Sequence, residues 1–244
     1  MHGVNLRRMA LALAVAGAVS ASPAAAHMGG MWDCARADTY CWAGGHNNFG
    51  CGGASCHGNV VENSTTQLMI QGLPASYAPG QDYDITVWVV GAPIYTFVDN
   101  GCRALGLVPG FNNLAGFNLE LGAGTQFAPL PTGTLTTVEG DTTTQVRPET
   151  QCDEINRFTG CGYEPTAACA APPDCDDTTV IGYQATHALG GTMQLSWKLR
   201  WTAPDPGVGD VKFFLAGNVV NGNCRPDIGD RWTVAGGTTV HQAP

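Results

Sequence analysis

Hydrophobic and polar residues alternate along several short stretches of this chain. The alternation is clearest at residues 83–89, 117–121 and 195–201, and residues 211–215 repeat it. Successive side chains of a strand point to opposite faces, so each stretch predicts a strand with one buried and one solvent-facing side. Four further strands are predicted at residues 67–71, 134–138, 180–187 and 231–234.

Glycine and proline separate these stretches, and no long stretch has the period of a helix. The pattern predicts an all-β fold, an antiparallel β-sandwich of about seven to nine strands. Trp197 and Trp201 share one side of their strand. Core packing is expected there, and a carbohydrate-stacking platform is the alternative if that side is open. The predicted core comprises Ile85, Val87, Phe117, Leu195, Trp197 and Phe213.

Residues 1–26 have the features of a secretory signal peptide. Arg7 and Arg8 form a basic start, residues 9–19 are apolar, and the run ending at Ala26 has the small residues needed for cleavage. We therefore expect a secreted or periplasmic protein. The apolar run is too short to span a membrane, and no later stretch approaches the ~20 residues that a spanning helix needs.

The remaining chain divides into two parts. Residues 27–60 are rich in Gly, Cys and His and predict an irregular N-terminal segment. Residues 61–244 carry the strand signals and predict the sandwich. Within them, residues 147–178 interrupt the pattern and hold four cysteines, which predicts a Cys-rich insert.

The charge of the chain argues against one class of partner. The chain has 11 basic and 20 acidic residues, and cleavage after Ala26 would change the net charge from −9 to −11. Nucleic-acid binding needs clustered Lys and Arg, so no such partner is expected. The chain also lacks the Gly-x-Ser-x-Gly and His-Glu-x-x-His motifs, and we do not expect an enzyme.

Ten cysteines follow the leader, an even number in an oxidising compartment, so disulfides are the default expectation. The four cysteines of the insert are expected to pair among themselves. Cys102 and Cys224 each follow a turn containing Asn-Gly and are expected to pair. Cys34 would pair with Cys41 if haem holds the next two. The insert cysteines are Cys152, Cys161, Cys169 and Cys175.

The run Cys51-Gly-Gly-Ala-Ser-Cys56-His57 places two thiols and an imidazole within seven residues. A Cys-x-x-Cys-His run is the attachment signature of c-type haem. Here four residues separate the cysteines in place of two. All four are small, so the loop could bulge while both sulfurs reach one porphyrin. The alternative is that both cysteines form disulfides and that His57 is a polar loop residue.

Several motifs together resemble Reeler domains. They are Tyr77-Ala-Pro-Gly80-Gln-Asp-Tyr83-Asp-Ile-Thr-Val, Gly116-Phe117-Asn-Leu, Thr186-His187, Trp201-Thr-Ala-Pro204 with Gly209-Asp-Val-Lys-Phe-Phe, and Ala216-Gly-Asn-Val-Val-Asn-Gly222 with Gly229-Asp230. The resemblance covers roughly residues 50–235 and implies an immunoglobulin-like β-sandwich. Secreted bacterial relatives carry Cys-x-x-Cys-His just before the first strand, where Ser55-Cys56-His57 stands here. The longer Cys spacing, the insert at 147–178 and the missing sorting tail depart from the family.

A haem iron with one His needs either an open face or a second axial ligand. The resemblance pairs His187 with the Cys-His segment, which makes His187 the candidate distal ligand and His57 the proximal one. Lesser candidates in the N-terminal segment are His46, Met28 and Met31. His27, as a mature N-terminus, would offer an amine and a ring nitrogen to copper, although an accident of the cleavage site is the preferred interpretation.

Two functions follow from these observations. The first is an exported Reeler-like domain that carries one haem c at Cys51, Cys56, His57 and His187 and transfers electrons to a redox partner without substrate turnover. The alternative is a disulfide-stapled extracellular binding or adhesion module without haem. The state of Cys51 and Cys56 discriminates between them, and neither the redox partner nor the extracellular ligand can be named from the sequence.

Overall fold

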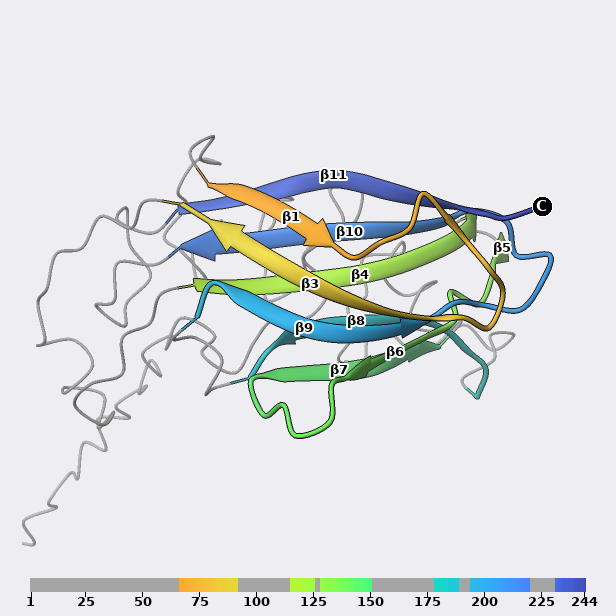
Figure 1. The fold of residues 1–244 in the computed structure, drawn as a ribbon, viewed down its shortest axis with the longest axis horizontal. Helices are drawn as coiled ribbons and strands as arrows, with labels where there is room; N and C mark the ends of the chain where they lie inside the picture. The colour runs from red at the N-terminus through yellow and green to blue at the C-terminus, as the bar shows by residue number, and fades with distance from the viewer. Residues whose placement is uncertain (1–65, 92–114, 126–127, 151–177, 189–193, 220–230) are drawn as a thin grey trace, which may run out of the picture.

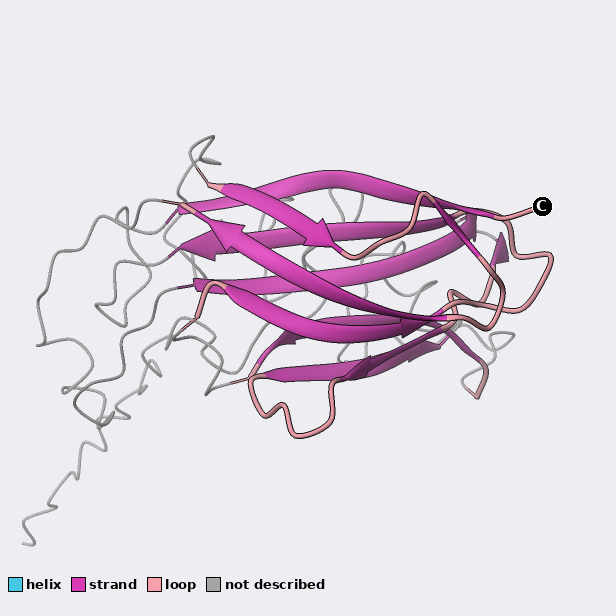
Figure 2. Ribbon diagram, in the orientation of Figure 1, coloured by secondary structure: helices cyan, strands magenta, loops and turns pink. Residues whose placement is uncertain are grey.

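The computed structural model describes residues 66–91, 115–125, 128–150, 178–188, 194–219 and 231–244. Eleven strands and no helix occur in this part of the chain (Figure 2). No helix long and apolar enough to cross a membrane is found among the described residues. The strands are β1 (Gln67–Gln71), β2 (Ser76–Tyr77), β3 (Asp82–Val90), β4 (Ala115–Thr125), β5 (Ala128–Pro129), β6 (Thr134–Thr137), β7 (Thr144–Thr150), β8 (Val180–His187), β9 (Ser196–Thr202), β10 (Val211–Val219) and β11 (Arg231–Gln242).

The strands form two sheets packed face to face, an all-β sandwich as the alternation predicts (Figure 1). One sheet has four strands in the order β1-β3-β9-β6. The other has the order β2-β11-β10-β4-β8-β7, with β5 paired to β4. All pairs are antiparallel except the short parallel contact between β11 and β2. Each sheet therefore has one inner face, which meets the other sheet, and one outer face.

Aromatic side chains from both sheets fill the space between the inner faces. Trp201 stacks on Tyr83 and meets the edges of Tyr77 and Phe213, with ring centroids 5.0 to 5.5 Å apart. Its indole N–H donates to the backbone oxygen of Thr132 over 2.9 Å. Such pairs stabilise beyond the area they bury, and a buried indole N–H needs an acceptor. The inward side of β9 is thus the core, and the carbohydrate-platform alternative for this side is wrong.

The predicted core residues are found there with one exception. Ile85, Val87, Phe117, Trp197 and Phe213 are all buried. The exception is Leu195, which is only partly buried because it lies just before β9 begins. Its backbone oxygen still accepts a hydrogen bond from the N–H of Val89, so it joins the sheet through its main chain.

Two predictions about the elements are corrected by the structure. The described residues hold eleven strands and not seven to nine, partly because β2 and β5 are two-residue strands without a sequence signal. The predicted insert at 147–178 is wrong at its start, since β7 continues to Thr150. Pro148 and three polar residues hide the strand pattern there, although proline is tolerated on an edge strand such as β7.

Candidate functional site: His187 and the outer faces of the sandwich

The structure describes one of the predicted ligands, His187. All ten cysteines lie outside the described residues, so the disulfide pairs and the haem attachment stay predictions. The other predicted ligands also lie outside the described residues: Cys51, Cys56, His57, His46, Met28, Met31 and His27.

His187 is the last residue of β8, and its side chain is buried at the end of the core. The backbone N–H of Phe117, on β4, donates to Nδ1 of His187 over 3.2 Å. The rings of Phe117 and Trp197 lie beside the imidazole, with centroids 6.4 and 6.3 Å away. The neighbouring Thr186 donates its hydroxyl to the backbone oxygen of Phe117 over 2.6 Å. Together these hydrogen bonds link the end of β8 to β4.

Gly116 leaves the space that this imidazole occupies. A Cβ atom at position 116 would collide with Cε1 of His187 and would lie 2.9 Å from Oδ1 of Asn218. The Gly116-Phe117 pair therefore serves His187 twice: the glycine gives it room, and the phenylalanine gives it a hydrogen bond.

The Nδ1 contact bears directly on the predicted role of His187 as an iron ligand. A neutral imidazole that accepts at Nδ1 carries its hydrogen on Nε2, and that nitrogen then has no lone pair for a metal. The opposite tautomer would donate from Nδ1 to the Phe117 oxygen, 3.4 Å away, as metal-ligating histidines commonly do. That tautomer would leave the Phe117 N–H without this acceptor. The contacts of Nδ1 are compatible with either tautomer, so the role of His187 as an axial ligand stays a prediction.

No group of three or more His, Cys, Asp or Glu side chains that could hold a metal is found among the described residues. Among the described residues, the neighbours of His187 include Thr186, Gly116 and the rings of Phe117 and Trp197. The described residues thus contain no complete metal centre.

The outer face of the larger sheet is polar and buried at its centre. Its polar side chains alternate along β4 and β8 with core residues such as Leu119 and Ala185, so they point away from the smaller sheet. We call this set the closed face, and all of its members are at most 1% exposed: Asn118, Glu120, Glu149, Gln184 and Thr186. The register places Thr186 opposite Asn118 and Gln184 opposite Glu120.

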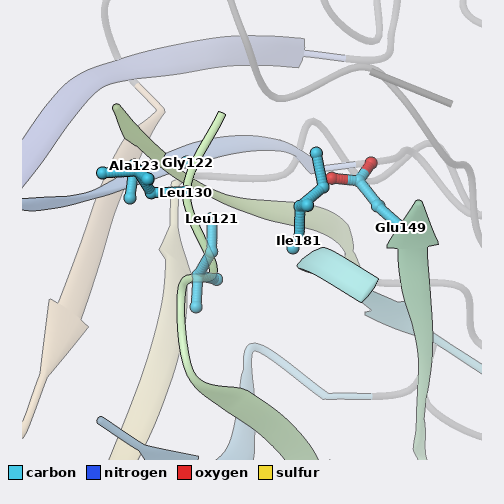
Figure 3. Close-up of a pocket in the computed structure, with 7 residues that line it drawn as sticks. Leu121, Gly122, Ala123, Leu130, Glu149 and Ile181 are labelled. Carbon is cyan, nitrogen blue, oxygen red and sulfur yellow. The ribbon is translucent and has the colours of Figure 1, made fainter. Parts of the chain in front are cut away.

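Glu149 is the residue of the closed face with the most specific surroundings. The amide of Gln184 donates to its Oε1, and its Oε2 would lie 3.0 Å from a Cβ atom at Gly182. Figure 3 shows the carboxylate beside Ile181, on one wall of a hollow whose other side is formed by Leu121, Ala123 and Leu130. The hollow has a volume of about 10 Å³, enough for about one water molecule. It cannot hold a substrate.

The outer face of the smaller sheet is equally polar but exposed. Outward residues of neighbouring strands stand in rows across it, set by the register of β1, β3, β9 and β6. We call this set the open face: Met69, Gln71, Asp82, Asp84, Thr86, Trp88, Val90, Thr134, Thr136, Ser196, Lys198, Arg200 and Thr202. Neighbouring strands lie ~4.8 Å apart, so the rows are closely spaced across the sheet.

Trp88 is the large aromatic residue of the open face. Met69 of β1 and Ser196 of β9 lie directly opposite it in the register. Its indole N–H donates to Oε1 of Gln71 over 2.9 Å. The alternation at 83–89 already places Trp88 on the solvent side of its strand, and an aromatic residue in that polar register was the signal for this surface.

Two polar pairs occupy the other end of the open face. Arg200 donates through Nε to Asp84 over 2.8 Å, and Thr202 donates its hydroxyl to Asp82 over 2.6 Å. The hydrogen bond from Arg200, with the charges of Arg200 and Lys198, lowers the pKa of Asp84. In turn, the hydrogen bond to Asp84 and the charge of Asp84 raise the pKa of Arg200. The open face thus carries two basic and two acidic side chains.

Comparison with known proteins gives a likeness of fold alone. No family model and no curated protein sequence matches the chain. Among solved structures, the Reelin-N domain of F-spondin is similar at 15% identity and a TM-score of 0.35, over 75% of this chain and 89% of that one. The human F-spondin reeler domain (fragment 1) is similar at 16% identity and a TM-score of 0.35, over 75% of this chain and 91% of that one. AvmM, which catalyses macrocyclization in alchivemycin A biosynthesis, is similar at 11% identity and a TM-score of 0.34, over 76% of this chain and 94% of that one. All three TM-scores lie below 0.5, so these similarities assign neither a family nor an activity to this chain.

Proposed function

We propose that this chain is an exported binding module that works without substrate turnover and engages its ligand through the open face. The observation that supports it is the difference between the two outer faces. The polar groups of the closed face are buried, whereas most of those of the open face are exposed, around the half-buried aromatic residue Trp88. Exposed polar and aromatic side chains on a rigid sheet are available to a ligand, and buried ones are not.

Catalysis is less well supported by the described residues. The acidic side chain beside a hollow is Glu149, and that hollow admits about one water molecule. A substrate site is normally a concave pocket of several hundred Å³. That the chain is not an enzyme stays a prediction and is part of this proposal.

A c-type haem carrier is the second candidate, and the run from Cys51 to His57 supports it. A haem bound there would supply one-electron transfer. His187 would serve it only after exchanging the hydrogen bond from the Phe117 N–H for one to the Phe117 oxygen. This required rearrangement makes haem the second candidate and not the first.

A haem assay on the full chain separates the two candidates. The chain is expressed for export in a bacterial host with a haem-maturation system, and its intact mass and pyridine haemochrome spectrum are measured. The binding module predicts a mass with bridged cysteines and no Soret band. One covalent haem per chain would overturn it, and His187→Ala would then convert a low-spin spectrum to high-spin if His187 is the distal ligand. An unchanged low-spin spectrum would assign that position to His46 or a methionine.

A further inference from the structure

We propose that the open face binds a neutral polysaccharide, a hydroxyl-rich chain that lies along β3 with one sugar ring stacked on Trp88. This inference rests on the proposed function, because it names the ligand class of the surface proposed there. Three features of the face lead to it: a fixed aromatic ring, a row of paired polar side chains and a balanced charge.

The indole of Trp88 is held in place before any ligand arrives. Its N–H is bound to Oε1 of Gln71, and the amide nitrogen of Gln71 contacts the sulfur of Met69 at 3.8 Å. The polar edge of the indole is therefore already used, and its apolar ring face is what remains to offer a ligand. Sugar rings present C–H groups on one face, which suits an aromatic surface. A side chain that is already ordered loses little conformational entropy on binding.

Polar side chains continue from Trp88 along the strand. Thr86 lies between Gln71 and Lys198 in the register, and the next row holds the Asp84–Arg200 pair. Each row offers hydrogen-bond donors beside acceptors, which is what a hydroxyl group requires, since it donates and accepts at once.

The rows are long enough for several units of a polymer chain. From Trp88 to Asp82 the strand rises by six residues, or about 20 Å. Small ligands bind in concave pockets, and the hollow beside Glu149 lies on the other sheet and holds about one water. An extended polymer is the ligand whose length matches a row of this kind.

The charge and composition of the face exclude other polymers. Two cations and two anions leave it without net charge, whereas nucleic acids and acidic polysaccharides require clustered cations. A protein partner of ordinary affinity requires an interface core that is apolar and poor in charge. On the open face the large exposed apolar side chains are Met69 and Val90, at 43% and 45%, which is a small set for such a core.

Affinity electrophoresis of the full chain tests the proposal. The folded protein migrates through native gels cast with mixed-linkage β-glucan, galactomannan or glycogen, which are neutral, or with alginate, which is acidic. We expect at least one neutral polymer to slow the chain and alginate not to. Trp88→Ala should weaken that binding about tenfold or more, and Trp88→Tyr should retain part of it. Lys212→Ala, an exposed change on β10 away from the open face, is the matched control and should leave binding unchanged.

The outcomes separate this inference from the proposed function. Retardation by no neutral polymer, or neutral binding that Trp88→Ala leaves intact in a variant with an unchanged melting temperature, contradicts the inference. Binding to alginate alone, lost in Lys198→Gln and Arg200→Gln, would overturn the neutral ligand class while leaving a binding module that uses the open face. A covalent haem in the assay above would overturn the proposed function itself.

Discussion

The two outer faces of the sandwich are built from the same kinds of residue and are used differently. On the closed face, Glu120 and Gln184 are fully buried in the middle of their sheet. On the open face, Asp84 and Arg200 form an ion pair with 69% and 47% of their side chains exposed. A buried polar group must be hydrogen-bonded, because losing its partner costs more than the bond itself contributes. We therefore expect the Gln184–Glu149 pair of the closed face to contribute to stability and the open face to contribute to binding.

The largest expected contrast is between two tryptophans on opposite sides of the four-stranded sheet. Trp201 packs in the aromatic core and Trp88 lies on the open face. Trp201→Ala should lower the free energy of unfolding by about 3–5 kcal/mol, because it leaves a cavity. Trp88→Ala should lower it by about 1 kcal/mol or less. Urea denaturation measures both, and equal losses would show that Trp88 is also a core residue.

A smaller contrast is expected between two acidic residues. Glu149→Ala should destabilise the fold by about 1–3 kcal/mol, because the buried amide of Gln184 loses its acceptor. Glu149→Gln, which keeps the shape and an acceptor oxygen, is the matched control and should cost less. Asp84→Ala on the open face should leave the denaturation midpoint unchanged, since exposed ion pairs contribute little. A midpoint that Glu149→Ala does not move would contradict the structural role of the closed face.

The smallest effect concerns the pH dependence of the turn that joins the two sheets. Burial alone would raise the pKa of Asp141, but hydrogen bonds from the Thr143 hydroxyl and N–H and from the Thr144 hydroxyl lower it below its usual 3.8. A depressed pKa in the folded state adds stability above the unfolded pKa, and this is lost as the pH falls through the folded value. The stability difference between the wild type and Asp141→Asn should therefore shrink below about pH 4. A difference that grows on acidification would show the opposite shift.

Much of the fold could be predicted from local patterns. The strand at 180–187 has the predicted bounds. The strong alternation along their strands predicted that Trp197 and Phe213 face the core, and both are buried. The pattern fails at β7, where Pro148 breaks it, and at β11, which continues to Gln242. The register of β11 against β10 shifts between Phe213 and Leu215 of β10. Alternate residues along β11 therefore do not all stay on one face of the sheet.

The candidate site was less predictable, and the reason is physical. Alternation separates the two sides of a strand but does not say whether the polar side meets solvent or protein. Glu120 and Asp84 therefore look alike in sequence, although one is fully buried and the other exposed. His187 was found from its motif, whereas its hydrogen bond depends on Phe117, 70 residues away in the chain.

Carboxyl labelling of the folded chain tests the difference between the two faces most directly. The native protein is treated with a water-soluble carbodiimide and glycine ethyl ester, and labelled peptides are quantified by mass spectrometry against the denatured chain. Asp82 and Asp84 should label at rates close to those of the denatured state, whereas Glu120 and Glu149 should be protected until the chain unfolds. Labelling of Glu120 and Glu149 in the native protein at the rate of Asp84 would contradict the account.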